Sequence, residues 1–300
     1  MAYMALVLLL IFIAIMLLGI PVGFGMGALT VIAFELLGGD LSMIPQKMFA
    51  GIDTYTCILL FILSADIMSV GGITNAIVVF CEKLVGHIKG GLAHVNVLAS
   101  MLFAGLSGSA AADAAGLGPI EIKMMTDGGY DKEFSSCLTA ASAIIGPIIP
   151  PSNIMIIYAG CVGTVSVGKM FLAGAIPGIL LGIAYMIFCY WISVKRKYPC
   201  RKTRATWKEI GHATWETLPA LLLPIIIMGT ITLGICTATE SSAIAVIYST
   251  IVAACKKNLS IKSFCRACIR SAKAAANVLF IIAISSAMAW AVTTLGVAQA

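Results

Sequence analysis

The sequence predicts an all-α polytopic membrane protein, on the grounds of composition and of apolar run length. Of its 300 residues, 60% are hydrophobic and only 11% are charged, whereas soluble domains have about 25% charged residues. Several apolar runs also reach or approach the roughly 20 residues that a membrane-spanning helix needs. These runs cover residues 4–20, 171–192, 218–233, 240–254 and 278–292. The first lacks the basic start and the cleavage site of a signal peptide, so we expect it to be retained.

Basic residues are concentrated in two segments, and this asymmetry predicts the topology. Residues 195–208 hold seven of the 19 Lys and Arg residues, and residues 256–273 hold six. Basic loops stay cytoplasmic, so we place both segments on that side. Residues 38–53 carry little positive charge and are expected to form an outside loop. Two crossings before that loop put the N-terminus outside, in the periplasm.

Weak self-similarity predicts an inverted repeat. The helix break at residues 19–23 is matched at 234–238, and the step from 61–65 to 71–73 is matched from 281–285 to 296–297. Because the two units would start on opposite sides, the pattern is typical of secondary transporters. Residues 1–200 would form the first repeat, 201–217 a cytoplasmic linker and 218–300 the start of an incomplete second repeat. We therefore expect a chain truncated at its C-terminus.

The first break in the apolar pattern covers residues 105–113 and is called the first helix break below. Its glycines and serines disfavour a continuous helix, and non-helical backbone at membrane depth survives only inside protein or beside water. This predicts a re-entrant hairpin near residues 100–120 whose tip exposes backbone groups and hydroxyls. The alternative is a small-residue contact between helices. Asp113 favours a functional site, because an ionisable residue is costly there.

The second helix break covers residues 146–153. Pro147, Pro150 and Pro151 remove backbone donors and open the helix, and Ser152 and Asn153 are suited to begin the next one. A bound ion would satisfy the opened carbonyls; a purely structural kink is the alternative.

A third helix break, at residues 237–242, has a simpler explanation. Thr239 followed by Ser242 could cap a helix, with Glu240 favourable in its first turn. The charged residues from Glu121 to Glu133 are interpreted as a solvated loop. The sequence offers no nucleophile–base pair, phosphate-binding loop or ATPase motif, so we expect neither an enzyme nor an ATP-driven pump.

Across these segments the chain resembles the large membrane subunit (DctM-like) of tripartite ATP-independent periplasmic (TRAP) transporters. The matching pieces are residues 19–23, 86–96, 105–113, 148–152, 237–243 and 279–299. One departure is Ala238, where the family usually has proline. Another is length, since family members run well past 300 residues.

The resemblance implies Na⁺-driven uptake of organic acid anions, such as C4-dicarboxylates, sialic acid or other sugar acids. It also implies the bacterial inner membrane, a periplasmic binding protein, a small membrane subunit, and an elevator-type transport domain moving against a scaffold. Na⁺ would be the coupling ion, with no cofactor and no nucleic acid. An ion-coupled anion carrier or antiporter without a binding protein is the alternative.

By this resemblance the first two breaks form one Na⁺ site and part of the substrate site. The candidate residues are Ser107, Gly108, Ser109, Asp113, Pro150, Pro151, Ser152 and Asn153, with Ser107 and Ser109 as Na⁺ ligands. The symmetric half of the site would lie in the second repeat. We therefore expect the 300-residue form not to transport.

Overall fold

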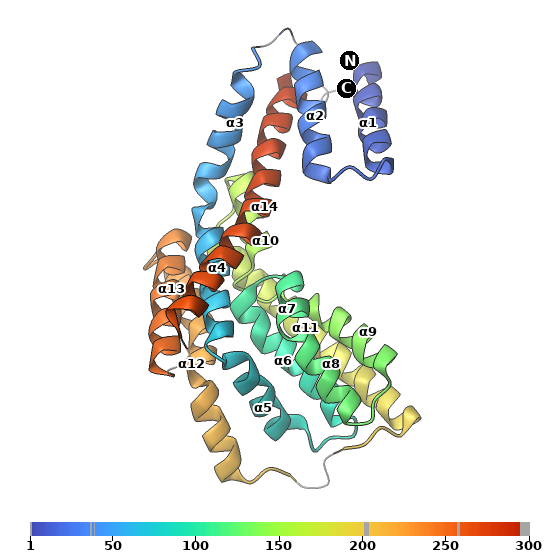
Figure 1. Cartoon of the computed structure of the whole chain (residues 1–300), viewed down its shortest axis with the longest axis vertical. Coiled ribbons are helices and arrows are strands. Elements are labelled where there is room, and N and C mark those ends of the chain that lie inside the picture. The colour runs from blue at the N-terminus through green and yellow to red at the C-terminus, as the bar shows by residue number, and fades with distance from the viewer. Residues whose placement is uncertain (1, 37, 39, 201–203, 257–258, 295–300) are drawn as a thin grey trace. The chain divides into compact units, whose positions relative to one another are not determined.

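The computed structural model describes residues 2–36, 38, 40–200, 204–256 and 259–294, and all regular structure among them is helical (Figure 1). Four of the helices, α11 to α14, are long and apolar enough to cross a membrane. The all-α polytopic class is thereby confirmed. The α-helices are α1 (Ala2–Leu17), α2 (Val22–Leu36), α3 (Met43–Ile52), α4 (Thr56–Val70), α5 (Ile73–Val85), α6 (Gly91–Ser107), α7 (Ala110–Gly116), α8 (Gly118–Asp127), α9 (Lys132–Ala143), α10 (Asn153–Val162), α11 (Val167–Arg196), α12 (Trp207–Thr232), α13 (Ala238–Cys255) and α14 (Ile261–Thr294).

The chain divides into two compact units. Unit 1 comprises residues 1–56 and 272–300, and unit 2 comprises residues 57–271. The α14 helix contributes residues to both. The repeat match at residues 296–297 lies outside the described residues.

Unit 1 is built from α1, α2, α3 and residues 272–294 of α14. Its core contains Leu29, Phe34 and Ala291, and the Phe34 ring stacks on Trp290 with centroids 5.0 Å apart. Residues 38–53, expected as a loop, instead contain α3. Asp40 accepts hydrogen bonds from the backbone N–H and the hydroxyl of Ser42 at 2.9 and 2.6 Å, directly before α3 begins. This local turn starts the helix, and the apolar side chains of its first turn pack on the unit 1 core.

Unit 2 is organised around α6, which contacts α5, α7, α8, α9, α11 and α12. Close helix approach depends on small residues. A Cβ atom at Gly105 would lie 2.8 Å from the ring of Pro224 on α12, and one at Gly182 on α11 would collide with Met101. The small residues of α6 and α11 therefore allow the backbones to come together.

A charged cluster outside the apolar helices holds the start of α9. Asp131, the residue before α9, accepts hydrogen bonds from Tyr198 and from Arg196 Nη1, both at 2.5 Å. These two donors hold the pKa of the Asp131 carboxyl below its usual value. The cluster ties the start of α9 to the chain that follows α11.

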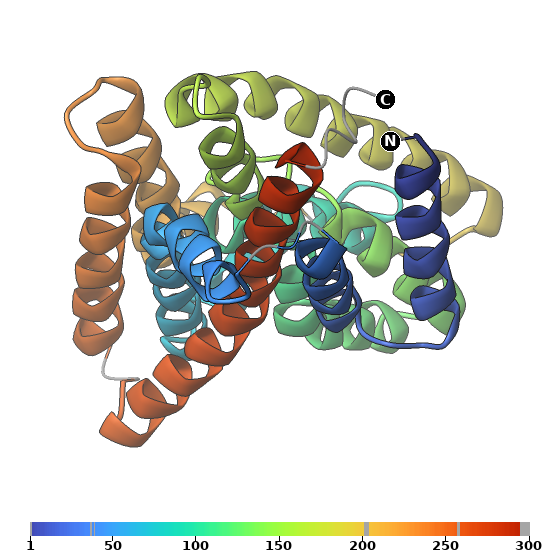
Figure 2. The ribbon, with the colours of Figure 1, turned by 90° about the horizontal axis from the view of Figure 1, so that it is seen from above.

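The α12 and α13 helices lie side by side as an antiparallel pair (Figure 2). The Tyr248 hydroxyl donates to the Pro219 carbonyl at 2.9 Å, and the hydroxyls of Thr230 and Ser241 are 3.0 Å apart. The α12 helix begins at Trp207, so most of the segment expected as a linker, residues 201–217, is helical.

The third helix break separates α12 from α13 and is closed by a capping box. Thr237 Oγ1 accepts from the Glu240 N–H at 3.3 Å, and Glu240 Oε2 accepts from the Thr237 N–H at 2.8 Å. The cap is therefore Thr237, and the prediction of Thr239 was wrong by two residues. Ala238 is the first helical residue, a position that suits proline because its N–H has no helical acceptor.

Candidate functional site

The first helix break turns the chain sharply between α6 and α7. Gly108, with φ +59°, ends α6 and donates its N–H to the Ala104 carbonyl at 3.0 Å. Ser109 is extended and begins α7, and its hydroxyl accepts from the Ala112 N–H at 3.4 Å. The left-handed conformation at Gly108 allows this change of direction.

The second helix break runs through turns from the end of α9 to the start of α10. Ser152 caps α10 by accepting from the Met155 N–H at 3.3 Å, and its hydroxyl donates to the Pro147 carbonyl at 2.5 Å. The prediction that the new helix begins at Ser152 and Asn153 is confirmed.

The two breaks meet in space. The backbone N–H of Asn153 donates to the Gly108 carbonyl, and its side-chain amide donates to the Ser107 carbonyl, each at 3.4 Å. A Cβ atom at Gly108 would collide with the Pro151 carbonyl oxygen. We call this contact, formed by residues 107–113 and 146–153, the junction. It brings together all eight candidate residues.

Asp113 is the charged residue of the junction, and it is only 1% exposed. Its Oδ1 atom accepts a hydrogen bond from the Ser107 hydroxyl, whereas Oδ2 has no hydrogen-bond partner among the described residues. A Cβ atom added to Gly146 would lie 2.7 Å from Oδ2, so this oxygen points at the second break. A buried carboxylate without a countercharge is unfavourable, which makes Oδ2 available to a cation.

The donor atoms around the junction are oxygens. Asp113 Oδ2 is one of them. The carbonyl oxygens of Pro150 and Pro151 are two more, because neither accepts a described hydrogen bond. The hydroxyl of Ser109 is partly exposed, and that of Ser107 is buried. Carboxylate, carbonyl and hydroxyl oxygens are the ligands that hard cations prefer. The junction can therefore hold such an ion.

The loop predicted from Glu121 to Glu133 is largely helical, although its charged residues other than Glu121 are exposed as predicted. Residues 118–127 form α8, and Glu121 is 0% exposed. The polar residues of the neighbouring helices were also missed; those buried behind the junction are Asn96, Ser100, Thr139 and Ser142. The signal available in the sequence was the helical spacing of Gly118, Glu121 and Met125, which form one buried face.

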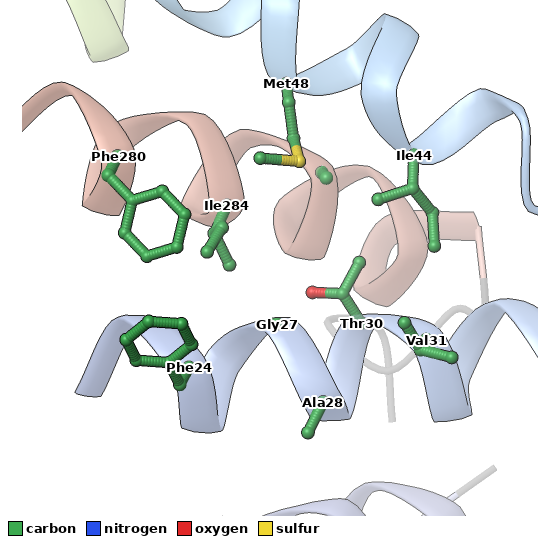
Figure 3. A pocket seen from close by; sticks show the side chains of 10 residues that line it. Phe24, Gly27, Ala28, Thr30, Val31, Ile44, Met48, Phe280 and Ile284 are labelled. Atoms are coloured by element: carbon green, nitrogen blue, oxygen red, sulfur yellow. The ribbon is translucent and has the colours of Figure 1, made fainter. Parts of the chain in front are cut away.

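A cavity in unit 1, away from the junction in sequence, is apolar. It encloses about 300 Å³ between α2, α3 and α14, with Phe24, Phe280, Ile284 and Met48 pointing into it (Figure 3). Thr30 supplies the oxygen visible in its wall, and that hydroxyl donates to the Met26 carbonyl at 2.8 Å. The lining therefore suits an apolar group and offers little to an ion.

The fold and the junction together define a polytopic helical membrane protein. A family model for the tripartite ATP-independent periplasmic transporter DctM component matches residues 9–300. The chain belongs to this family, and its characterised relatives are transport permeases rather than enzymes.

Curated relatives agree with the family. The sialic acid TRAP transporter large permease protein SiaM of Vibrio cholerae is 45% identical over 77% of this chain and 54% of its own length. The sialic acid permease protein SiaT of Haemophilus influenzae is 40% identical over 88% of this chain and 43% of its own length. The C4-dicarboxylate TRAP transporter large permease protein DctM of Pseudomonas aeruginosa is 36% identical over 89% of this chain and 62% of its own length. The chain thus spans about half the length of these relatives.

Proposed function

We propose that this chain is the membrane permease subunit of a Na⁺-coupled transporter that takes up an organic acid anion. A periplasmic binding protein would deliver the anion, and a small membrane subunit would accompany the permease in the bacterial inner membrane. Family membership supports this assignment, and the two basic segments support a periplasmic N-terminus.

The observation that carries the Na⁺ proposal is the buried Asp113 Oδ2 atom, which has no partner and points across the junction. Na⁺ would bind there with oxygens of the first break, including those of Ser107 and Ser109, and with the loop carbonyls of the second. In secondary transporters, unwound backbone carbonyls coordinate Na⁺ at such interrupted helices.

The substrate class is proposed from chemistry that the relatives share. The substrates for which these relatives are named include sialic acid, C4-dicarboxylate and 2,3-diketo-L-gulonate, which are all organic acids. The start of α10 lies at the junction, and the partial positive charge of a helix start favours an anion nearby. We therefore propose that the junction binds the carboxylate end of the substrate next to the ion.

We further propose that the junction travels with a transport domain against a scaffold. The weak repeat between residues 1–200 and the segment from 218 supports an inverted-repeat architecture, which is common in carriers of this kind. The helix ends that meet at the junction suit a site that opens in turn to each side.

The test is uptake into proteoliposomes by the intact protein, reconstituted with its binding protein and small subunit. Each of the variants Ser107→Ala and Ser109→Ala should move the Na⁺ titration of uptake to higher concentration, because each removes an oxygen ligand. Thr237→Ala, which alters a cap remote in sequence from the junction, is the control and should leave the titration in place. An unchanged titration in both serine variants would remove these residues from the ion site.

The alternative is an ion-coupled anion carrier or antiporter of similar architecture that needs no binding protein. Repeating the uptake without the binding protein separates the two. Uptake at an undiminished rate would favour the alternative.

A further inference from the structure

Behind the junction, unit 2 buries a second carboxyl that the proposed Na⁺ site does not use. Glu121 on α8 is 0% exposed, and neither of its carboxyl oxygens has a hydrogen-bond partner among the described residues. None of the described ion pairs includes it either. An ionised carboxylate is strongly disfavoured in such a position, so the charge of this carboxyl must be removed by a proton or balanced by a bound cation.

The nearest polar groups are already engaged with one another. The Ser100 hydroxyl lies close enough to act on the Glu121 carboxyl, but it donates to Ser142 Oγ at 3.0 Å. Ser142 donates to Asn96 Oδ1 at 2.9 Å, and the Asn96 amide donates to Thr139 Oγ1 at 2.7 Å. These bonds use the hydroxyl protons of Ser100 and Ser142, so in this arrangement neither hydroxyl donates to Glu121.

The titratable groups on the packed helices supply no countercharge. The two titratable groups that interact electrostatically with Glu121 are Asp113 on α7 and Cys81 on α5. Neither can carry a positive charge. The one titratable residue of α6, His94, is buried, with Nε2 unpartnered. The remaining groups on α8 and α9, Lys123, Asp127, Lys132, Glu133 and Cys137, are exposed to solvent or to the membrane environment. Two carboxyls within electrostatic reach, Asp113 and Glu121, oppose each other's ionisation.

We propose that Glu121 is a proton-binding site, with Ser100 as its switching partner. A Na⁺ ion would need several oxygen ligands besides this carboxyl, whereas a proton needs a single carboxyl oxygen. While Glu121 carries the proton, the Ser100 hydroxyl points to Ser142, as in this structure. When the proton leaves, the hydroxyl turns and donates to the carboxylate, which stabilises the ionised form.

Infrared spectroscopy of the purified chain in lipid nanodiscs tests the protonation directly. The difference spectrum between wild type and Glu121→Gln at neutral pH should contain the carbonyl band of a protonated carboxylic acid. Asp127→Asn, which changes an exposed carboxyl on the same helix, should give only ionised-carboxylate bands. A Glu121 difference with only ionised bands would overturn the proposal, and so would a protonated band that appears only after Na⁺ is removed.

The role of Ser100 as the switching partner is tested by the pH at which the Glu121 infrared band disappears. Ser100→Ala should raise the pH at which the Glu121 band disappears, because the ionised form loses its donor. Ser135→Ala removes a buried hydroxyl of α9 that donates to the Asp131 carbonyl at 2.8 Å, and it should not move that midpoint. Equal midpoints in wild type and Ser100→Ala would refute the switch.

The consequence for transport rests on the proposed function. In the reconstituted system, uptake by the wild type should change as pH passes the infrared midpoint, and Glu121→Gln should abolish that pH dependence. A pH dependence that survives in the variant would contradict a role for this proton in transport. If no uptake occurs at all, the proposed function fails while the infrared result still decides the proton site.

Discussion

Gly108 has two separate reasons to be glycine, and they can be distinguished. Its φ of +59° lies in the left-handed region, and a Cβ atom there would also meet the Pro151 carbonyl oxygen and, at 3.2 Å, the Asn153 nitrogen. Gly163, which ends α10, shares the left-handed conformation at φ +69° but has nothing within 4 Å of a Cβ position. The pair therefore separates backbone strain from contact between the two helix breaks.

We predict that Gly163→Ala costs about 1–2 kcal/mol of stability, the penalty of a left-handed residue with a side chain. Gly108→Ala should cost more, because the new methyl group forces the two breaks apart. Thermal unfolding of the two variants in the same detergent measures the difference. Equal losses would mean that the breaks do not depend on close contact at Gly108.

Individual residues of the sequence predicted the helix breaks but not the buried polar residues packed next to them. Proline, glycine and serine act locally, so the positions of the junction residues could be inferred before their contacts were known. The burial of Glu121 was missed, because its charged neighbours Lys123 and Asp127 suggested a solvated loop and outweighed the helical spacing of the buried face. Its environment is made by α6 and α9, whose packing depends on the whole unit.

At the scale of the helices, two N-caps of similar geometry differ in whether they belong to the candidate site. Ser152 and Thr237 both accept a backbone N–H three residues ahead, at 3.3 Å each. Only Ser152 belongs to the junction, where its hydroxyl also reaches the Pro147 carbonyl.

We predict that Ser152→Ala and Thr237→Ala each lower stability by about 1 kcal/mol, the usual cost of a lost N-cap. Only Ser152→Ala should also reduce the stabilisation expected from Na⁺ at the proposed site, because that stabilisation rises with the logarithm of one plus the ratio of ion concentration to dissociation constant. Thermal unfolding with and without Na⁺ measures both effects. A similar loss of Na⁺ stabilisation in Thr237→Ala would separate the effect from the junction.

Two elements escaped the sequence analysis for recognisable reasons. The α3 helix is short and follows a turn, so its low charge was interpreted as an outside loop. The start of α12 carried a sequence signal, Thr206 followed by Glu209, which is the spacing of a capping box. In the structure Glu209 Oε2 accepts from the Thr206 N–H at 2.9 Å.

For the whole molecule, the distribution of basic residues predicts the orientation of the chain in the membrane. The basic segments 195–208 and 256–273 predict a cytoplasmic position for the chain between α11 and α12.

Alkaline phosphatase fused after Lys202 should therefore be inactive, since the enzyme needs the periplasm, and green fluorescent protein fused there should fluoresce. A fusion after Asp40 serves as the matched control and should give the opposite result. Phosphatase activity after Lys202 would reverse the proposed orientation of the membrane helices.

The division into units also sets an order of assembly during synthesis. Unit 1 is made of the first 56 residues and of residues from 272 onward, with all of unit 2 between them. Domains generally fold as units while the chain is being made, from the N-terminus onward. The α1 to α3 helices are synthesised first, but unit 1 is complete only when α14 has been made. Unit 2, which contains the junction, can therefore fold before unit 1 is complete.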